Sequence, residues 1–363
     1  MQEIKLHTPI IDTVIVCLKA IFEEQKVADK EVATILKQNK SFGSRDRSLI
    51  AETAYDIVRW KLKYEYFADQ LQLTSYKSLL LISFLNRKYT IKNIEILGVA
   101  LEDIHKLKEL IHQAIEAKDV EQSYPKELYD FCLENIGEKW HSLAAALNKK
   151  PSVFIRVNTL KTTKEKVLQL LINENVEARD CFASLAMTDG SLAMTNKNCI
   201  QILSKNNLKN SDLYKQGLFE FQDIGSQSIG DFLFNTIENK STLNEIKILD
   251  LCAGAGGKTL HLSALLNNKG KIYATDYKAA RLKNLHQRAE QAGCKNIEII
   301  DFKEAKKLKN IDLVLIDAPC SGTGTFKRQA DLKYKITQEK IKEYQTIQAN
   351  LLNEYKSVIL KNG

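Results

Sequence analysis

The sequence has little of what marks metal-binding, secreted or membrane-spanning proteins. Its seven cysteines are dispersed, with no CxxC pair and no nearby pair of histidines, so a zinc site is not expected. An odd, scattered set of cysteines also fits a reducing cytoplasm better than a disulfide framework. The N-terminal twenty residues are amphipathic, unlike a signal peptide, and no apolar run approaches the roughly 20 residues of a membrane span. We expect a cytoplasmic, monomeric protein without a metal.

Proline is almost absent from the N-terminal third, where Pro9 is the one proline before residue 119. Apolar residues recur there at helical spacing, as at Ile11, Val14 and Leu18. We expect helices throughout residues 1–118, packed as a small bundle. The polar stretch 41–47 is expected to form a loop that caps a helix beginning near residue 48.

Charge of one sign is only slightly in excess. Lys and Arg number 53 against 45 Asp and Glu, which gives a formal net charge of +8 and a pI near 8.9. This balance suits a polyanionic partner, but on charge alone an ordinary lysine-rich surface is the preferred interpretation. The 363 residues, 44% of them hydrophobic, are enough for two or three globular domains.

Beyond residue 118 the pattern changes twice. A helix starting at Pro125, a strand over 153–158 and a helix through residue 171 indicate a small α+β module over 119–217. From 218 to 363 strands and helices alternate, which predicts a doubly wound, Rossmann-like parallel sheet. Its strands are expected at 246–251, 271–275, 297–300 and 312–316, with a long helix at 338–360. The segment 184–188 recurs as 191–195 and is expected to form a hairpin or loop.

A glycine-rich loop over 250–259 follows the first strand of this sheet. A phosphate-binding Walker loop would need glycine at Cys252, and a dinucleotide loop would need glycine at Thr259, so neither pattern fits. The remaining interpretation is an S-adenosylmethionine loop, in which glycines let the backbone approach a ligand at a helix N-terminus. The expected cofactor-binding residues of this loop are Cys252, Ala253, Gly254, Ala255, Gly256, Gly257 and Lys258.

Carboxylates follow the next two strands. Asp276 is placed to accept both ribose hydroxyls of a nucleoside, and Asp301 to meet its adenine end. Capping of the following helix is the plainer role for a lone aspartate. Because Asp276 coincides with the glycine loop, we favour the nucleoside role.

The fourth strand is followed by a thiol, a carboxylate and a proline in the string Asp317-Ala318-Pro319-Cys320-Ser321-Gly322-Thr323-Gly324. Ligands bind beyond the carboxyl ends of such strands. A buried structural cysteine is the usual alternative for Cys320, but its neighbours favour a catalytic role.

With these motifs the sequence resembles the Sun/Fmu family of RNA (cytosine-5)-methyltransferases, whose bacterial members modify ribosomal RNA. The resemblance implies a NusB-like RNA-binding domain over 1–118, an RNA-binding α+β module over 119–217, and an S-adenosylmethionine-dependent methyltransferase domain over 218–363. It is carried by residues 221–223, the loop 252–259, Asp276, Arg281-Leu282, and the string 317–324. Arg281 thereby joins the expected cofactor site.

The family chemistry is covalent. A thiolate adds to carbon 6 of cytosine, carbon 5 takes the methyl group and loses its proton, and the thiolate then leaves. By resemblance, Asp317 hydrogen-bonds the cytosine edge and contacts the cofactor, while Cys320 assists the release. The target base must be unstacked to enter the pocket.

The family's attacking thiol lies in a Thr-Cys-Ser segment on the strand after the long helix, and this chain ends at Asn362-Gly363. We therefore expect a truncated domain that lacks its last strands, with little methyl transfer by the chain as given. An RNA- and cofactor-binding protein without catalysis is the alternative. Methylation of an amino group ranks last, because 317–320 is not an Asn/Asp-Pro-Pro-aromatic segment.

Overall fold

The computed structural model describes residues 2–181, 197–204, 208–237 and 242–358. The repeated segments 184–188 and 191–195 lie outside these residues. By internal contacts the chain forms two compact units: the helical unit, residues 1–151 with 321–341, and the sheet unit, residues 152–320 with 342–363. The three predicted domain boundaries stay predictions, and each unit is described by itself.

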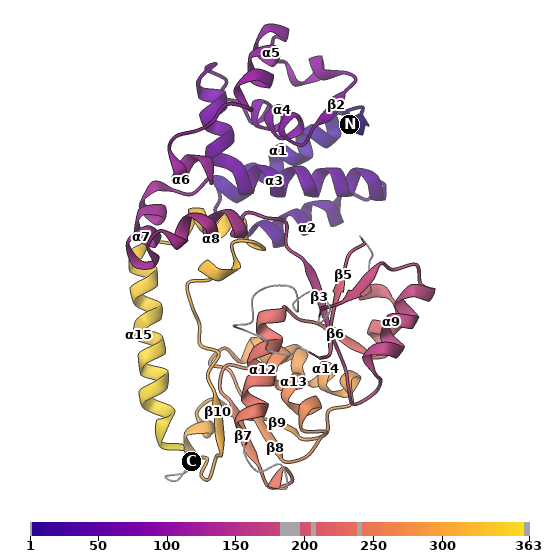
Figure 1. Cartoon of the computed structure of the whole chain (residues 1–363), viewed down its shortest axis with the longest axis vertical. Helices are drawn as coiled ribbons and strands as arrows, with labels where there is room; N and C mark the ends of the chain where they lie inside the picture. The colour runs from indigo at the N-terminus through magenta and orange to yellow at the C-terminus, as the bar shows by residue number, and fades with distance from the viewer. Residues whose placement is uncertain (1, 182–196, 205–207, 238–241, 359–363) are drawn as a thin grey trace. The chain divides into compact units, whose positions relative to one another are not determined.

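The helical unit contains the predicted bundle (Figure 1). Its core joins the apolar faces of its first four helices, including Ile11, Val14, Leu18, Ile57 and Leu80. Its helices are α1 (Thr8–Phe22), α2 (Ala28–Gln38), α3 (Ser44–Asp69), α4 (Tyr76–Asn86), α5 (Leu101–Leu110), α6 (Lys118–Glu121), α7 (Lys126–Ile136) and α8 (Lys139–Leu147). The helix expected after Pro125 is α7, with Pro125 at its N-cap.

Two sequence-based expectations for this unit are wrong. Residues 1–118 are not helical throughout, because β1 (Gln2–Ile4) and β2 (Tyr89–Ile91) pair as a parallel two-stranded sheet. Strands of three residues are too short for alternation to be visible in a sequence. The loop expected at 41–47 is shorter, since α3 begins at Ser44 with Gly43 at its N-cap and no side-chain cap.

The sheet unit contains two four-stranded sheets. The first is antiparallel, in the order β4-β5-β3-β6. Its strands are β3 (Val153–Val157), β4 (Ala178–Asp180), β5 (Cys199–Ile202) and β6 (Phe219–Phe221), accompanied by α9 (Lys164–Asn173) and α11 (Asp212–Lys215). The predicted domain boundary at 217/218 would separate β6 from the strand β3 with which it pairs.

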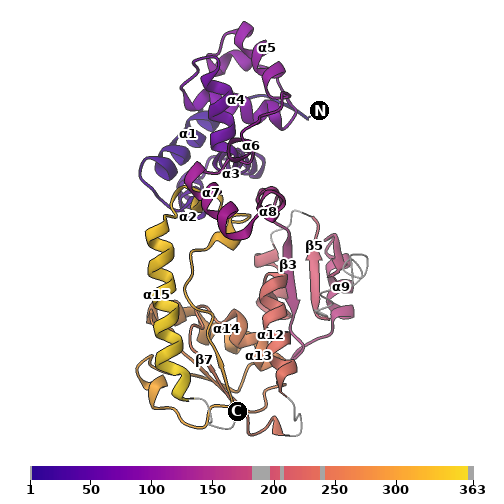
Figure 2. The same cartoon turned by 60° about the vertical axis from the view of Figure 1, so that its left-hand side comes forward.

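The second sheet is parallel, in the order β10-β7-β8-β9. Its strands are β7 (Lys247–Asp250), β8 (Lys271–Ala274), β9 (Ile297–Ile299) and β10 (Leu313–Leu315). Figure 2 shows α12 (Ile224–Thr236), α13 (Gly257–Leu265) and α14 (Leu285–Ala292) grouped beside it. The long helix predicted at 338–360 is α15 (Gln338–Tyr355), followed by one 3₁₀ turn at Lys356–Val358.

Helices cover both faces of the parallel sheet. Ile248 of β7 packs with Leu262 of α13, whereas its neighbour Leu249 packs with Leu351 and Tyr355 of α15. Successive side chains of a strand point to opposite faces, so each face buries an apolar layer. The predicted doubly wound α/β fold is confirmed.

Candidate cofactor and active site

The strand order places a binding crevice at the carboxyl ends of β7 and β10. From β7 the chain proceeds outward through β8 to β9, while β10 lies on the other side of β7. Loops that leave two such neighbouring strands diverge, and α/β proteins bind their ligands at this point. The glycine loop follows β7 and the Asp317 segment follows β10, so both predicted motifs meet here.

The glycine loop needs glycine at particular positions. Gly254 and Gly256 have φ angles of +55° and +88°, in the left-handed region that favours glycine. A Cβ on Gly256 would also lie 2.1 Å from Cδ1 of the buried Leu285, whereas Gly254 has nothing within 4 Å of a Cβ. The space at Gly254 is therefore open for a ligand.

Asp276 is buried, and its carboxylate connects the ends of β7 and β8. It accepts hydrogen bonds from the backbone N–H of Gly254 at 3.1 Å and of Lys278 at 2.9 Å, and Nη1 of Arg281 lies 3.9 Å away. It thus orders the glycine loop and also makes the local turn expected of a capping aspartate. Asp301 is exposed after β9 and accepts from the N–H of Lys303 at 2.8 Å.

Asp250, the last residue of β7, is a site residue that the sequence did not single out. Its Oδ2 accepts a 2.7 Å hydrogen bond from Thr259, while its buried Oδ1 has no partner. Burial raises the pKa of this carboxyl to about 7. It lines a cavity of about 80 Å³ together with Ser226, Cys252, Ala253, Gly257, Lys258 and Asp317.

Lys258 and Asp317 meet across this cavity. Nζ of Lys258 lies 2.5 Å from Oδ2 of Asp317, and Asp317 remains about half exposed. Cys320 follows three residues later and is exposed. Gln348 of α15 fixes the intervening backbone by donating to the carbonyl of Pro319 at 2.9 Å. An ammonium and a carboxylate are thus held beside an accessible thiol segment.

The two predicted site cysteines differ in environment. Cys252 is buried, and burial raises the pKa of its thiol to about 12, so it stays protonated and unreactive. Cys252 contributes to the site through its backbone and by lining the cavity. Cys320 keeps the exposure that a reactive thiol needs.

The residues present fit S-adenosylmethionine. The unsatisfied Oδ1 of Asp250 is an acceptor for an ammonium such as that of a methionine moiety. The cavity is smaller than the roughly 300–1,000 Å³ of whole-ligand pockets, so it suits one end of the cofactor. The open backbone at Gly254 leaves room for the rest.

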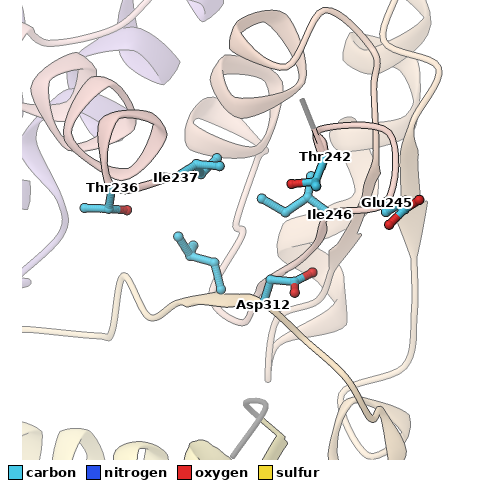
Figure 3. Close-up of a pocket in the computed structure, with 7 residues that line it drawn as sticks. Thr236, Ile237, Thr242, Glu245, Ile246 and Asp312 are labelled. Atoms are coloured by element: carbon cyan, nitrogen blue, oxygen red, sulfur yellow. The ribbon is translucent and has the colours of Figure 1, made fainter. Parts of the chain in front are cut away.

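A second hollow of about 420 Å³ lies at the opposite end of the strands of the same sheet (Figure 3). Ile246 immediately precedes β7, and Asp312 precedes β10 and accepts from the N–H of Lys247 at 2.7 Å. These are the amino ends of the strands, opposite the edge where α/β ligands bind. We therefore do not assign the cofactor to this hollow.

Arg47 and Arg59 belong to the segment that resembles an RNA-binding domain. Their guanidinium groups donate hydrogen bonds to backbone carbonyls. Arg47 donates to the carbonyls of Leu36 and Asn39, at the end of α2, and to that of Phe42. Arg59 donates to the carbonyl of Lys327 at 3.0 Å. Both guanidinium groups hold the fold of the helical unit.

Within the described residues, no cluster of three or more His, Cys, Asp or Glu side chains could hold a metal ion. In the same part of the chain, no helix is long and apolar enough to cross a membrane.

Two family models match the chain. Residues 239–363 match the 16S rRNA methyltransferase RsmB/F model, and residues 124–187 match the ferredoxin-like domain of RsmF/B-like methyltransferases. The second match covers α7 and α8 of the helical unit and β3, α9 and β4 of the sheet unit.

Relatives of similar length match almost the whole chain. Ribosomal RNA small subunit methyltransferase B of Photorhabdus laumondii is 22% identical over 92% of this chain and 81% of its own length. The probable enzyme of the same name from Bacillus subtilis is 22% identical over 98% of this chain and 83% of its own length. The crystal structure of PH0851 is 20% identical, with a TM-score of 0.69 over 98% of this chain and 84% of that one, which shows the shared fold. The chain carries the methyltransferase domain and the ferredoxin-like domain of the RsmB/F methyltransferases, in agreement with its resemblance to the Sun/Fmu family, and S-adenosylmethionine is confirmed as its cofactor.

Proposed function

We propose that this protein methylates carbon 5 of a cytosine in small-subunit ribosomal RNA. The observation that carries the proposal is the contact between Lys258 of the glycine loop and Asp317, which line one cavity at the carboxyl ends of β7 and β10. Asp317 lies three residues before Cys320 in the sequence. The names of the relatives support ribosomal RNA as the substrate. The string 317–324, which resembles the cytosine-5 enzymes, supports the target atom.

Each side chain has a task in this reaction. S-adenosylmethionine, when bound, supplies the methyl group. Asp250 holds its ammonium end, and Asp276 and Asp301 face its nucleoside. Asp317 hydrogen-bonds the cytosine edge, and Lys258 holds that carboxylate in place through their 2.5 Å contact. Cys320 assists departure of the thiol that has added to carbon 6 of the base.

The test is methyl transfer from radiolabelled S-adenosylmethionine to unmodified 16S rRNA and to small ribosomal subunits, followed by mapping of 5-methylcytosine. Asp317→Asn and Lys258→Met are expected to lower transfer about 100-fold or more, the scale of a lost catalytic polar group. Asp312→Asn is the matched control, because Asp312 precedes the same strand at its other end. Equal losses in all three variants would contradict the assignment.

The role of Cys320 has its own test. If another thiol attacks the base, Cys320→Ser is expected to accumulate an RNA–protein adduct that survives denaturation, because release is slowed. If Cys320 is itself the nucleophile, the variant forms no adduct and transfers no methyl group. Cofactor and RNA binding without transfer by the wild-type chain would favour the non-catalytic alternative.

We also propose that both the helical unit and the antiparallel sheet contact RNA and that the protein works as a cytoplasmic monomer. Its excess positive charge supports the RNA contact. Affinity for a ribosomal RNA fragment is expected to fall steeply with salt concentration, since phosphate contacts release counterions. A flat salt dependence, or a dimer mass in light scattering, would contradict these proposals.

A further inference from the structure

Two backbone carbonyls of the glycine loop are held by side chains from other parts of the sheet unit. The carbonyl of Gly257 accepts from Nη1 of Arg156 at 3.0 Å and from Nε2 of Gln222 at 3.4 Å. The carbonyl of Ala255 accepts from Nη1 of Arg288. These donors come from β3, from the residue after β6 and from α14.

The donors are fixed by a second set of contacts. Nη1 of Arg156 also donates to Oε1 of Gln222 at 2.8 Å, and Nη2 of Arg288 lies 2.8 Å from Oε2 of Glu220. Glu220 and Arg156 face each other directly in the β3–β6 pair. We call Arg156, Glu220, Gln222 and Arg288 the carbonyl clamp.

Two charged members of the clamp are buried, and the cost of burying them argues against a mere packing role. Arg156 and Glu220 are 3% and 4% exposed. Apolar residues would fill the same space without the cost of removing two charges from water. Burial lowers the pKa of Arg156 to about 10, and the charge of Glu220 opposes that shift, so the guanidinium stays charged at neutral pH. These residues provide charged hydrogen-bond donors that are held in a fixed orientation.

The clamp acts where the loop's geometry is most demanding. The two held carbonyls flank Gly256. Its φ of +88° is a backbone conformation that residues other than glycine rarely adopt. Because a peptide unit is planar, fixing a carbonyl also fixes the direction of the next N–H. The carbonyl of Gly257 thereby sets the N–H of Lys258, in the first turn of α13, where backbone donors face a ligand.

We propose that Arg156, Glu220 and Arg288 are positioning residues that set the affinity for S-adenosylmethionine without touching it. The antiparallel sheet, whose proposed role is to contact RNA, is then also part of the cofactor site. This inference rests on the cofactor and is independent of which RNA atom is methylated.

Arg288 is the residue to change, since its side chain is about one fifth exposed whereas Arg156 and Glu220 are buried. Arg288→Met is expected to raise the Kd for S-adenosylhomocysteine in calorimetry about tenfold, the effect of losing a charge-assisted hydrogen bond. Arg288→Lys, which keeps the charge and one donor, is expected to recover part of that loss.

Asn158→Ala is the matched control. The buried Asn158 follows β3 and donates to the carbonyls of Gly217 and Ala292, so it ties the same strand to the end of α14 without reaching the loop. It is expected to lower the melting temperature at least as much as Arg288→Met but to leave the Kd within about twofold. Changes in Kd that simply follow the melting temperature in both variants would overturn the proposal.

Hydrogen exchange of the free protein gives a readout that does not depend on cofactor. Amides of residues 254–259 are expected to exchange faster in Arg288→Met than in Asn158→Ala. Unchanged exchange would overturn the clamp even if the wild type binds cofactor. If the wild type binds no S-adenosylhomocysteine, the cofactor assignment fails, and loop exchange still decides whether the clamp exists.

Discussion

Asp250 has an unusual electrostatic setting for a carboxylate. It is buried, one oxygen is bonded to Thr259 and the other has no partner. Its pKa of about 7 in the folded protein compares with about 3.9 in an unfolded chain. Ionisation therefore favours the unfolded state between these two values.

The pH dependence of stability follows from this shift. As pH rises from about 4 to 7, the unfolded chain loses this proton and the folded chain keeps it, so the free energy of unfolding falls by roughly 4 kcal/mol at most. Asp250→Asn is expected to remove this slope, measured by urea unfolding at several pH values. Parallel stability curves for the two proteins would contradict it.

Cofactor binding is expected to show the opposite trend. An ammonium beside Oδ1 favours the ionised carboxylate, so the affinity for S-adenosylhomocysteine should rise between pH 6 and 8 as Asp250 ionises more readily. Calorimetry of the wild type near pH 6.5 should detect proton release from the carboxyl. In Asp250→Asn, which cannot ionise, the affinity should be lower at pH 8 and this component of the pH dependence absent.

For single residues, the sequence shows which side chains belong to the site better than it shows their burial and their contacts. The loop 252–258, Asp276 and Asp317 could be named because glycine spacing and strand ends are visible in a sequence. Asp250 was missed because burial and an unsatisfied oxygen depend on contacts with Thr259 and the cavity. Gln222 stood in a motif that carries the resemblance and Arg156 in a predicted strand, but their shared acceptor at Gly257 appears only once the sheets are folded.

At the scale of an element, the turn between β7 and α13 depends on two glycines in different ways. Gly254→Ala meets no atom and is expected to cost about 1–2 kcal/mol for its left-handed backbone. Gly256→Ala adds a clash with the buried Leu285, worth about 1–3 kcal/mol more. Thermal unfolding should rank the variants in that order, and equal costs would show that Leu285 moves aside freely.

The junction of α2 and α3 depends on Arg47. Its guanidinium satisfies carbonyls at the end of α2, so Arg47→Ala is expected to lower the free energy of unfolding by about 2 kcal/mol. Arg45→Ala, at an exposed position two residues away, should change it by less than about 0.5 kcal/mol. If Arg47 instead contacts RNA, its loss would leave stability unchanged and reduce the salt dependence of RNA binding.

Elements that show a pattern within their own segment of sequence were predicted. Elements that depend on contacts with residues far away in the sequence were not. The four strands of the parallel sheet lie within the predicted strand segments, whose apolar residues pack on both faces of β7. The early start of α3 was missed because the carbonyls that Arg47 binds lie 8 and 11 residues earlier in the sequence. The pairing of β1 with β2 joins residues 87 positions apart, for which no local pattern exists.

At the scale of the whole molecule, the chain returns to the helical unit after the catalytic segment. Residues 321–341 follow Cys320 directly and belong to the helical unit by contacts. Phe326 is buried with Tyr124 and Trp140, and Asp331 accepts from the N–H of Ala28 at the start of α2. The sequence could not predict this return, because its contacts span more than 180 residues.

Lys333 is the centre of this return and provides its test. Its ammonium is buried over the ring of Tyr124 and donates to the carbonyls of Arg59 and Ser123, both at 3.1 Å, and to Oδ1 of Asn148 at 2.7 Å. Lys333→Met removes the donor of two buried hydrogen bonds and of one partly buried hydrogen bond, which should cost about 3–5 kcal/mol.

The loss should be confined to one part of the molecule. Hydrogen exchange is expected to accelerate in α3, α8 and residues 321–341, while amides of β7 and β8 keep their protection. Lys340→Met, at an exposed position of the same segment, should change neither. Because the segment continues from Asp317 and Cys320, methyl transfer should fall in Lys333→Met while the affinity for S-adenosylhomocysteine is retained. Loss of cofactor affinity together with transfer would mean instead that the two units unfold as one.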